Sequence, residues 1–137
     1  ILIGIFEFGL FMYEYTQVVK VVESATLYAT KNSANIYAMN PFSSTSIAAA
    51  AGTTPWNDAI SITAGCSCPG SNSGNLTLTP FQGAPLPKCN QSAVCNGNTL
   101  PVQPYVLIKI THPHSYVFLN HLFPNLSASY SNYVRIN

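Results

Sequence analysis

The chain has 137 residues, of which 47% are hydrophobic and only 7% are charged, and its mean hydropathy is +0.21. This length allows one compact domain with an appendage, and the hydropathy is high for a soluble protein, so we expect part of the apolar surface to be buried in lipid or against partners. The formal net charge of +1 rests on five Lys and Arg side chains, too few for the basic surface that binds nucleic acid.

The first 40 residues are predicted to form one helix, which Pro41 ends. These 40 residues contain no Pro. Their glycines, Gly4 and Gly9, lie in the apolar first part, where membrane helices tolerate glycine. A helix of this length would extend about 60 Å and project beyond a bilayer. Further along, apolar residues at helical spacing form one stripe that faces the chain's own head or a neighbour. The stripe consists of Phe11, Tyr15, Val18, Val22, Ala25, Ala29 and Ile36.

The apolar start of this helix, residues 1–13, is shorter than the roughly 20 residues that a transmembrane helix requires. We therefore expect part of the span to lie upstream of Ile1. Glu7 lies inside the apolar run, where an ionised carboxylate normally faces protein, water or a partner cation. Two interpretations stay open for Glu7, an acid near the lipid headgroups or a subunit contact. If Glu7 makes a subunit contact, Glu14, two turns further along on a similar face of the helix, is expected to take part in it.

Residues 41–137 are predicted to form a separate, β-rich head. Residues 44–51 favour a short helix that Gly52 ends. Apolar and polar residues alternate over 60–64, 105–111 and 126–136, and weakly over 76–78, which predicts antiparallel strands with one solvated face. The Pro-rich stretch 80–104 predicts an ordered loop pinned by covalent bridges.

Four cysteines in a short chain with few charges indicate disulfides, and hence a head outside the cytoplasm. Cys66 and Cys68 are too close for a relaxed mutual bond, so each is expected to pair with one of Cys89 and Cys95. Two connectivities remain open. Each bridge would contribute about 3–4 kcal/mol by restricting the unfolded chain. A zinc site is the alternative, but structural zinc sites use pairs of cysteines separated by two or more residues, and one residue separates Cys66 from Cys68.

The histidines and acids favour a protein without catalytic activity. His112 and His114 can share a strand face, but Pro113 is expected to interrupt the strand and no carboxylate lies nearby in sequence, so we predict no metal site and no cofactor. Asp58 is the head's one acid, which leaves no carboxylate pair for catalysis. We therefore expect no small-molecule substrate. Trp56 and the tyrosines are candidate contact anchors, although burial in the core is the commoner fate of an aromatic side chain.

Taken in order, four passages resemble the TadE-like proteins, pseudopilins of the tight-adherence (Tad or Flp) pilus systems. They are Ile-Phe-Glu-Phe-Gly at 5–9, the helix continuing to 24–29, the strand and cysteines at 60–69, and the ending 105–137 with Tyr-Val-Arg-Ile at 133–136. The resemblance covers nearly the whole chain. It implies an α+β fold of pilin type, with a long N-terminal helix followed by a small antiparallel sheet stapled by disulfides.

The resemblance also implies cleavage by a prepilin peptidase, and a glutamate shortly after the cut that registers neighbouring helices. Glu7 matches a second Glu-Phe-Gly element further along such helices, so the registering role is not transferred to it. This places the cleavage site upstream of Ile1, in agreement with the short apolar run.

Two functions follow from this reading, and both are non-enzymatic. The first is a Tad-like pilus subunit that packs against identical copies or other pilin-like subunits and against membrane lipid. The alternative is an accessory, membrane-anchored subunit of an unrelated membrane complex. Either way, helix 1–40 is expected in the inner membrane or a filament, and the head in the periplasm or outside the cell. The predicted packing residues of the helix are Gly4, Glu7, Phe8, Gly9, Phe11, Tyr15, Val18, Val22, Ala25 and Ala29.

Overall fold

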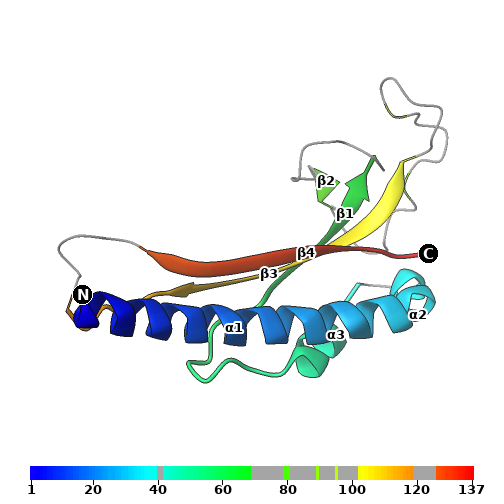
Figure 1. The fold of residues 1–137 in the computed structure, drawn as a ribbon. Helices are drawn as coiled ribbons and strands as arrows, with labels where there is room; N and C mark the ends of the chain where they lie inside the picture. Colours follow the sequence, from blue (N-terminus) through cyan, green and yellow to red (C-terminus); the bar gives the residue numbers. More distant parts are fainter. Residues whose placement is uncertain (40–41, 69–78, 81–88, 90–94, 96–101, 119–125) are drawn as a thin grey trace.

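The computed structural model describes residues 1–39, 42–68, 79–80, 89, 95, 102–118 and 126–137. A long helix lies along one face of a small antiparallel sheet, which confirms the predicted α+β class (Figure 1). The helices are α1 (Leu2–Lys31), α2 (Ser33–Ala38) and α3 (Thr45–Ala51). The strands are β1 (Ser61–Ser67), β2 (Thr79–Pro80), β3 (Gln103–Pro113) and β4 (Ser127–Arg135).

The prediction of one uninterrupted helix over residues 1–40 is wrong at Asn32. There the backbone leaves the helical conformation, with φ −111° and ψ 22°, and α2 begins at the next residue. The backbone N–H and the side-chain Nδ2 of Asn32 both donate to the carbonyl oxygen of Tyr28, each at 3.0 Å. Such local side-chain bonds compete with regular helix geometry, which explains the break. Pro41 lies outside the described residues.

The second half of α1 supplies the helical side of the core. Val18, Val22, Ala25 and Ala29 are fully buried. They belong to one cluster with apolar residues of the sheet and of α3, among them Ile47, Val106, Ile108, Ala128, Val134 and Ile136. Small side chains on α1 let the helix lie close to the sheet. Four of the residues predicted to pack against other subunits therefore pack within the chain.

The sheet has the order β2-β1-β3-β4, with all neighbours antiparallel. The predicted alternation is confirmed in β3, where Val106, Ile108 and Ile110 are buried and Lys109 is exposed. The prediction for residues 76–78 lies outside the described residues, as does most of 80–104. Figure 1 shows β3 and β4 as the long strands that run beside α1.

Pro113 was expected to break the pairing of its strand, and this is wrong, because Pro113 is the last residue of β3 and still pairs with Ser127. The neighbouring His114 N–H donates to the Leu126 carbonyl on the β4 side at 2.9 Å. Because backbone N–H groups alternate along a strand, position 113 faces the other side. The pairing of β1 with β3 has already ended there, at Ser61 and Lys109. The missing N–H of Pro113 therefore costs the sheet no hydrogen bond.

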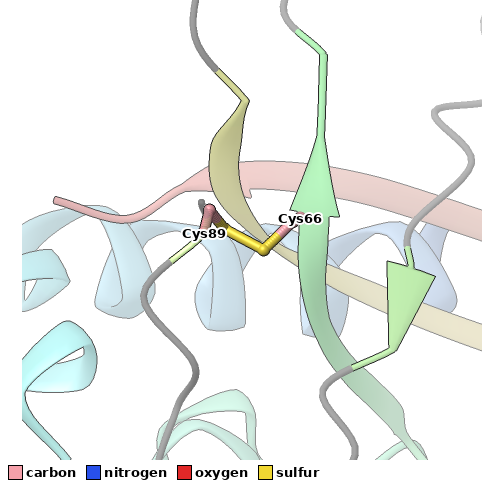
Figure 2. The surroundings of a disulfide bond; sticks show 2 residues. All are labelled: Cys66 and Cys89. Atoms are coloured by element: carbon pink, nitrogen blue, oxygen red, sulfur yellow. A yellow bond between two sulfur atoms is a disulfide. The ribbon is translucent and has the colours of Figure 1, made fainter. Parts of the chain in front are cut away.

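Two disulfides are present, as predicted, and the structure selects one of the two open connectivities. Cys66 is bonded to Cys89, and Cys68 to Cys95. Figure 2 shows the first bridge joining the end of β1 to the segment that carries Cys89. The bridges connect residues 23 and 27 positions apart. Both staple the end of the sheet that lies away from the N-terminus of α1 (Figure 1).

The connectivity can be checked by mass spectrometry of the unreduced protein. Because only Ser67 separates Cys66 from Cys68, a proteolytic peptide carries both bridges, and electron-transfer fragmentation is needed to resolve them. We expect fragments that join Cys66 to Cys89 and Cys68 to Cys95. The nested pairing of Cys66 with Cys95 and of Cys68 with Cys89, four free thiols or bound zinc would contradict this result.

Candidate functional site

Five ionisable side chains from three separate parts of the chain meet between α1 and the far end of β3. Glu7 and Glu14 come from α1, Asp58 from the loop before β1, and His112 and His114 from the end of β3. They alternate in space as acid, histidine, acid, histidine, acid, in the order Asp58, His112, Glu14, His114, Glu7. We call this set the acid–histidine cluster. No carboxylate lies near the histidines along the chain, but the fold brings three beside them.

Glu14 is the central member, because its two carboxylate oxygens face both histidines. Its Oε2 accepts a hydrogen bond from His114 Nδ1 at 2.5 Å, and its Oε1 lies 3.9 Å from His112 Nε2. Asp58 Oδ1 accepts from His112 Nδ1 at 2.9 Å. At the other end, His114 Nε2 lies 3.5 Å from Glu7 Oε2. Each imidazole thus lies between two carboxylates.

Both ends of the cluster are fixed to the backbone or to a neighbouring hydroxyl. Glu7 Oε1 accepts hydrogen bonds from the backbone N–H groups of Val117 at 2.9 Å and Phe118 at 2.5 Å. Asp58 Oδ2 accepts from the Thr54 hydroxyl at 2.8 Å, and the Asp58 N–H donates back to that hydroxyl at 3.0 Å. The first half of α1 is therefore tied to the segment that follows β3, through Glu7, and to His114, through Glu14.

Aromatic rings enclose the histidines. Trp56 stacks on His112 with ring centroids 4.2 Å apart, and Phe11 and Tyr116 contact His114 edge-on at 5.6 and 4.6 Å. The His114 side chain is 1% exposed. In such surroundings hydrogen bonds between charged groups are stronger than in water, and a lost partner costs more.

The cluster brings three carboxyl groups and two imidazoles together. Four of its members, Glu7, Glu14, His112 and His114, are less than 10% exposed. Within the described residues no group of three or more His, Cys, Asp or Glu side chains is placed to hold a metal ion.

The first half of α1 has its polarity reversed relative to an ordinary surface helix, which turns its apolar side inward. Of residues 1–9, Glu7 alone is buried. The large apolar side chains of this helix end point outward. They are Ile1, Leu2, Ile3, Ile5, Phe6, Phe8, Met12 and Tyr13. Val117 and Phe118 are exposed too, and Phe118 lies edge-on to Phe6 at 6.5 Å. We call these ten residues the apolar end of the molecule.

The remaining predicted packing residues are divided between this surface and the edge of the core. Phe8 is exposed, and a side chain at Gly4 or Gly9 would meet open space. Phe11 and Tyr15 are partly buried and pack against the core. Their contacts with another subunit stay a prediction. The third histidine of the sequence, His121, lies outside the described residues.

Sequence reasoning missed the pairing of the acids with the histidines, although two signals were present. Glu7 and Glu14 are seven residues apart in a helix, which places them on one face, and His112 and His114 are two apart in a strand. Two acids on one helix face and two histidines on one strand face are complementary when that helix covers that strand. The missing information was which face of α1 the sheet would meet.

No helix in the described part of the chain combines the length and the apolar character needed to cross a bilayer. Comparison with protein-family models, with curated proteins and with solved structures found no match to this chain.

Proposed function

We propose that this chain is a non-enzymatic assembly subunit of pilin type that is held in its assembly by the N-terminal half of α1, in a Tad-like pilus. The observation that carries the proposal is the reversed polarity of this helix end. Its acid lies inside, and its large apolar side chains lie outside. Extended apolar surface of this kind marks a site of contact with protein or membrane.

The acid–histidine cluster explains how such a surface is built. Glu7 and Glu14 are the acids of the first half of α1, and both face inward, where Glu7 Oε1 and Glu14 Oε2 accept hydrogen bonds from the chain itself. Ionisable residues on helices in apolar surroundings face protein in the same way. The outward surface is consequently left without charge, so apolar helices or lipid can cover it at little desolvation cost.

The TadE-like resemblance supports a pilus over other assemblies, and the disulfide-stapled head is consistent with a position outside the cytoplasm. The alternative, an accessory subunit of an unrelated membrane complex, would use the same surface. The two functions differ in what contacts the apolar end. In a pilus subunit it is other pilin-like helices, and in an accessory subunit it is a different protein.

The experiment is to fractionate the native assembly and compare two variants of the full chain. We expect the unaltered protein to sediment in filaments or in a membrane assembly. Replacing two exposed residues of the apolar end, Leu2→Ser with Ile5→Ser, should lower the assembled fraction about tenfold or more, since burying such a side chain contributes about 1.5–3 kcal/mol. The control is Leu27→Ser in the other half of α1, where Leu27 is 61% exposed against 64% for Ile5.

An unaltered chain that remained a soluble monomer without detergent would contradict the proposal. Equal assembly of the double variant and of the control would contradict the assigned surface. Mass spectrometry of the purified assembly separates the two functions, because an excess of a protein unrelated to pilins would favour the accessory subunit.

A further inference from the structure

The contacts of His114 determine how many protons the acid–histidine cluster needs. An imidazole has two ring nitrogens, and only the imidazolium carries a proton on both. In His114 both nitrogens face a carboxyl oxygen. Nδ1 lies 2.5 Å from Glu14 Oε2, and Nε2 lies 3.5 Å from Glu7 Oε2. An ionised carboxylate only accepts hydrogen bonds, so each of these two contacts requires a proton of its own.

A neutral His114 between two ionised carboxylates supplies only one proton for the two contacts. The short hydrogen bond to Glu14 takes that proton. The lone pair of Nε2 would then face the lone pairs of Glu7 Oε2. At this site the His114 side chain is 1% exposed and the Glu7 side chain 5%, so solvent screens their repulsion poorly. One further proton between the two atoms turns the repulsion into a hydrogen-bonded contact.

The second histidine of the cluster needs no such proton. His112 Nδ1 donates to Asp58 Oδ1 at 2.9 Å, which a neutral imidazole can do. Its Nε2 lies 3.9 Å from Glu14 Oε1, beyond hydrogen-bond distance. The contacts therefore require one extra proton in the cluster, and they place it between His114 and Glu7.

The titratable groups around His114 come from three parts of the chain. They are Glu7 and Glu14 of α1, Asp58 of the loop before β1, and His112 and Tyr116 on either side of His114 in the sequence. Among the described residues, each ion pair of His114 itself is with an acid, Glu7 or Glu14. The charges next to the imidazole are thus of the sign that attracts a proton.

We propose that the folded chain holds one buried proton between His114 Nε2 and Glu7 Oε2, and that this proton keeps the first half of α1 on the sheet. In the unfolded chain an imidazole loses its proton above about pH 6.5. The folded state then binds one proton more than the unfolded state, so the free energy of unfolding falls as the pH rises. This proton belongs to the single chain and is independent of the assembly proposed above.

Losing the proton should release the start of α1 and leave the rest of the helix in place. Glu7 Oε1 holds the backbone N–H groups of Val117 and Phe118. Repulsion of Glu7 from His114 therefore also loosens the segment that follows β3. The second half of α1 packs in the apolar core, away from the cluster. The pH thus acts on one end of the helix.

The variant Glu7→Gln removes the need for the proton and keeps the shape of the side chain. Its amide oxygen can accept from Val117 and Phe118 in place of Oε1, and its amide N–H can donate to the lone pair of His114 Nε2. The matched control is Glu23→Gln, the same change at an exposed acid of the same helix. The unfolding constant of each full-length chain is measured by denaturant titration between about pH 6 and 9, on both sides of the free imidazole's range.

One extra bound proton corresponds to a tenfold change in the unfolding constant per pH unit, by linkage. Above about pH 6.5 we expect the unfolding constant of the unaltered chain to rise, relative to that of Glu7→Gln, about threefold to tenfold per pH unit. Glu23→Gln should follow the unaltered chain. Parallel curves for the unaltered chain and Glu7→Gln, or a fall in place of the rise, would overturn the proposal. If Glu23→Gln behaved as Glu7→Gln does, the effect would be one of general charge, and the proposal would fail as well.

Amide hydrogen exchange tests where the proton acts. In the unaltered chain the protection factors of Val117 and Phe118 should fall with rising pH, while that of Val106 in the core of β3 changes less. In Glu7→Gln the fall at Val117 and Phe118 should be absent. An equal fall at Val106 would show that the pH acts on the whole fold, and would overturn the assignment to the start of α1.

Discussion

The His114→Ala variant is expected to lose about 3–5 kcal/mol of the free energy of unfolding, measured by denaturant titration of the full chain. His114 is the most deeply buried member of the acid–histidine cluster and lies between Glu7 and Glu14. Removing it leaves two buried carboxylates without the imidazole between them, which is the costly way to break a buried ion pair. The edge contacts with Phe11 and Tyr116 are lost as well, and a cavity is left.

A graded comparison separates the cluster from general packing. His112→Ala should cost less than His114→Ala, because Asp58 keeps the Thr54 hydroxyl and Glu14 keeps its bond to His114. Thr111→Ala, an exposed neighbour on the same strand, should change stability by less than about 0.5 kcal/mol beyond the loss of its hydroxyl contact with Ser129. The reverse order for the two histidines would contradict the bridging role of Glu14.

A double-mutant cycle tests whether the cluster acts as a unit. Glu14→Ala and His114→Ala remove two partners of one short hydrogen bond, so their combined effect should be smaller than the sum of the single effects by about 1 kcal/mol or more. Additive effects would mean that the two side chains stabilise the fold independently. The helix would then be held on the sheet by the apolar core of its second half.

The regular elements of this fold are largely predictable from the sequence, for local reasons. The strands of the head alternate apolar and polar residues, and α3 ends at Gly52, which adopts a φ of 75° that suits glycine. The stripe Val18, Val22, Ala25, Ala29 is the buried face of α1, because its spacing follows the helical turn.

The candidate site was not predictable in the same way, because it depends on how distant segments meet. Glu14 and His114 are 100 positions apart, and their contact follows from the placement of α1 across β3. Pattern reasoning treats an apolar run as the buried side of a helix. At the start of α1 the relation is reversed, and Glu7 is the buried residue among exposed apolar ones. The sequence pattern does not say which side of such a run the rest of the chain will cover.

The second large effect is expected from the bridge between β1 and Cys89. Replacing Cys66 and Cys89 together by Ser should lower the free energy of unfolding by about 3 kcal/mol, because the bridge restricts a loop of intermediate length in the unfolded chain. The measurement is denaturant unfolding of the double variant against the unaltered chain. A loss well below about 2 kcal/mol would show that strain in the folded protein offsets the stabilisation gained by restricting the unfolded chain.

The second bridge supplies the matched control. Cys68 and Cys95 are 27 positions apart against 23 for the first pair, and in the chain-entropy account this difference changes stability by only about 0.1 kcal/mol. The two double Ser variants should therefore lose almost the same amount. A clear difference between the two losses would instead come from the folded head. Cys66 lies within β1, opposite residues of both β2 and β3, whereas Cys68 lies beyond the end of the strand. In that case the first bridge would fix the strand register, and its loss should also weaken the pairing of β1 with β3, seen as faster amide exchange in β1 than in the second variant.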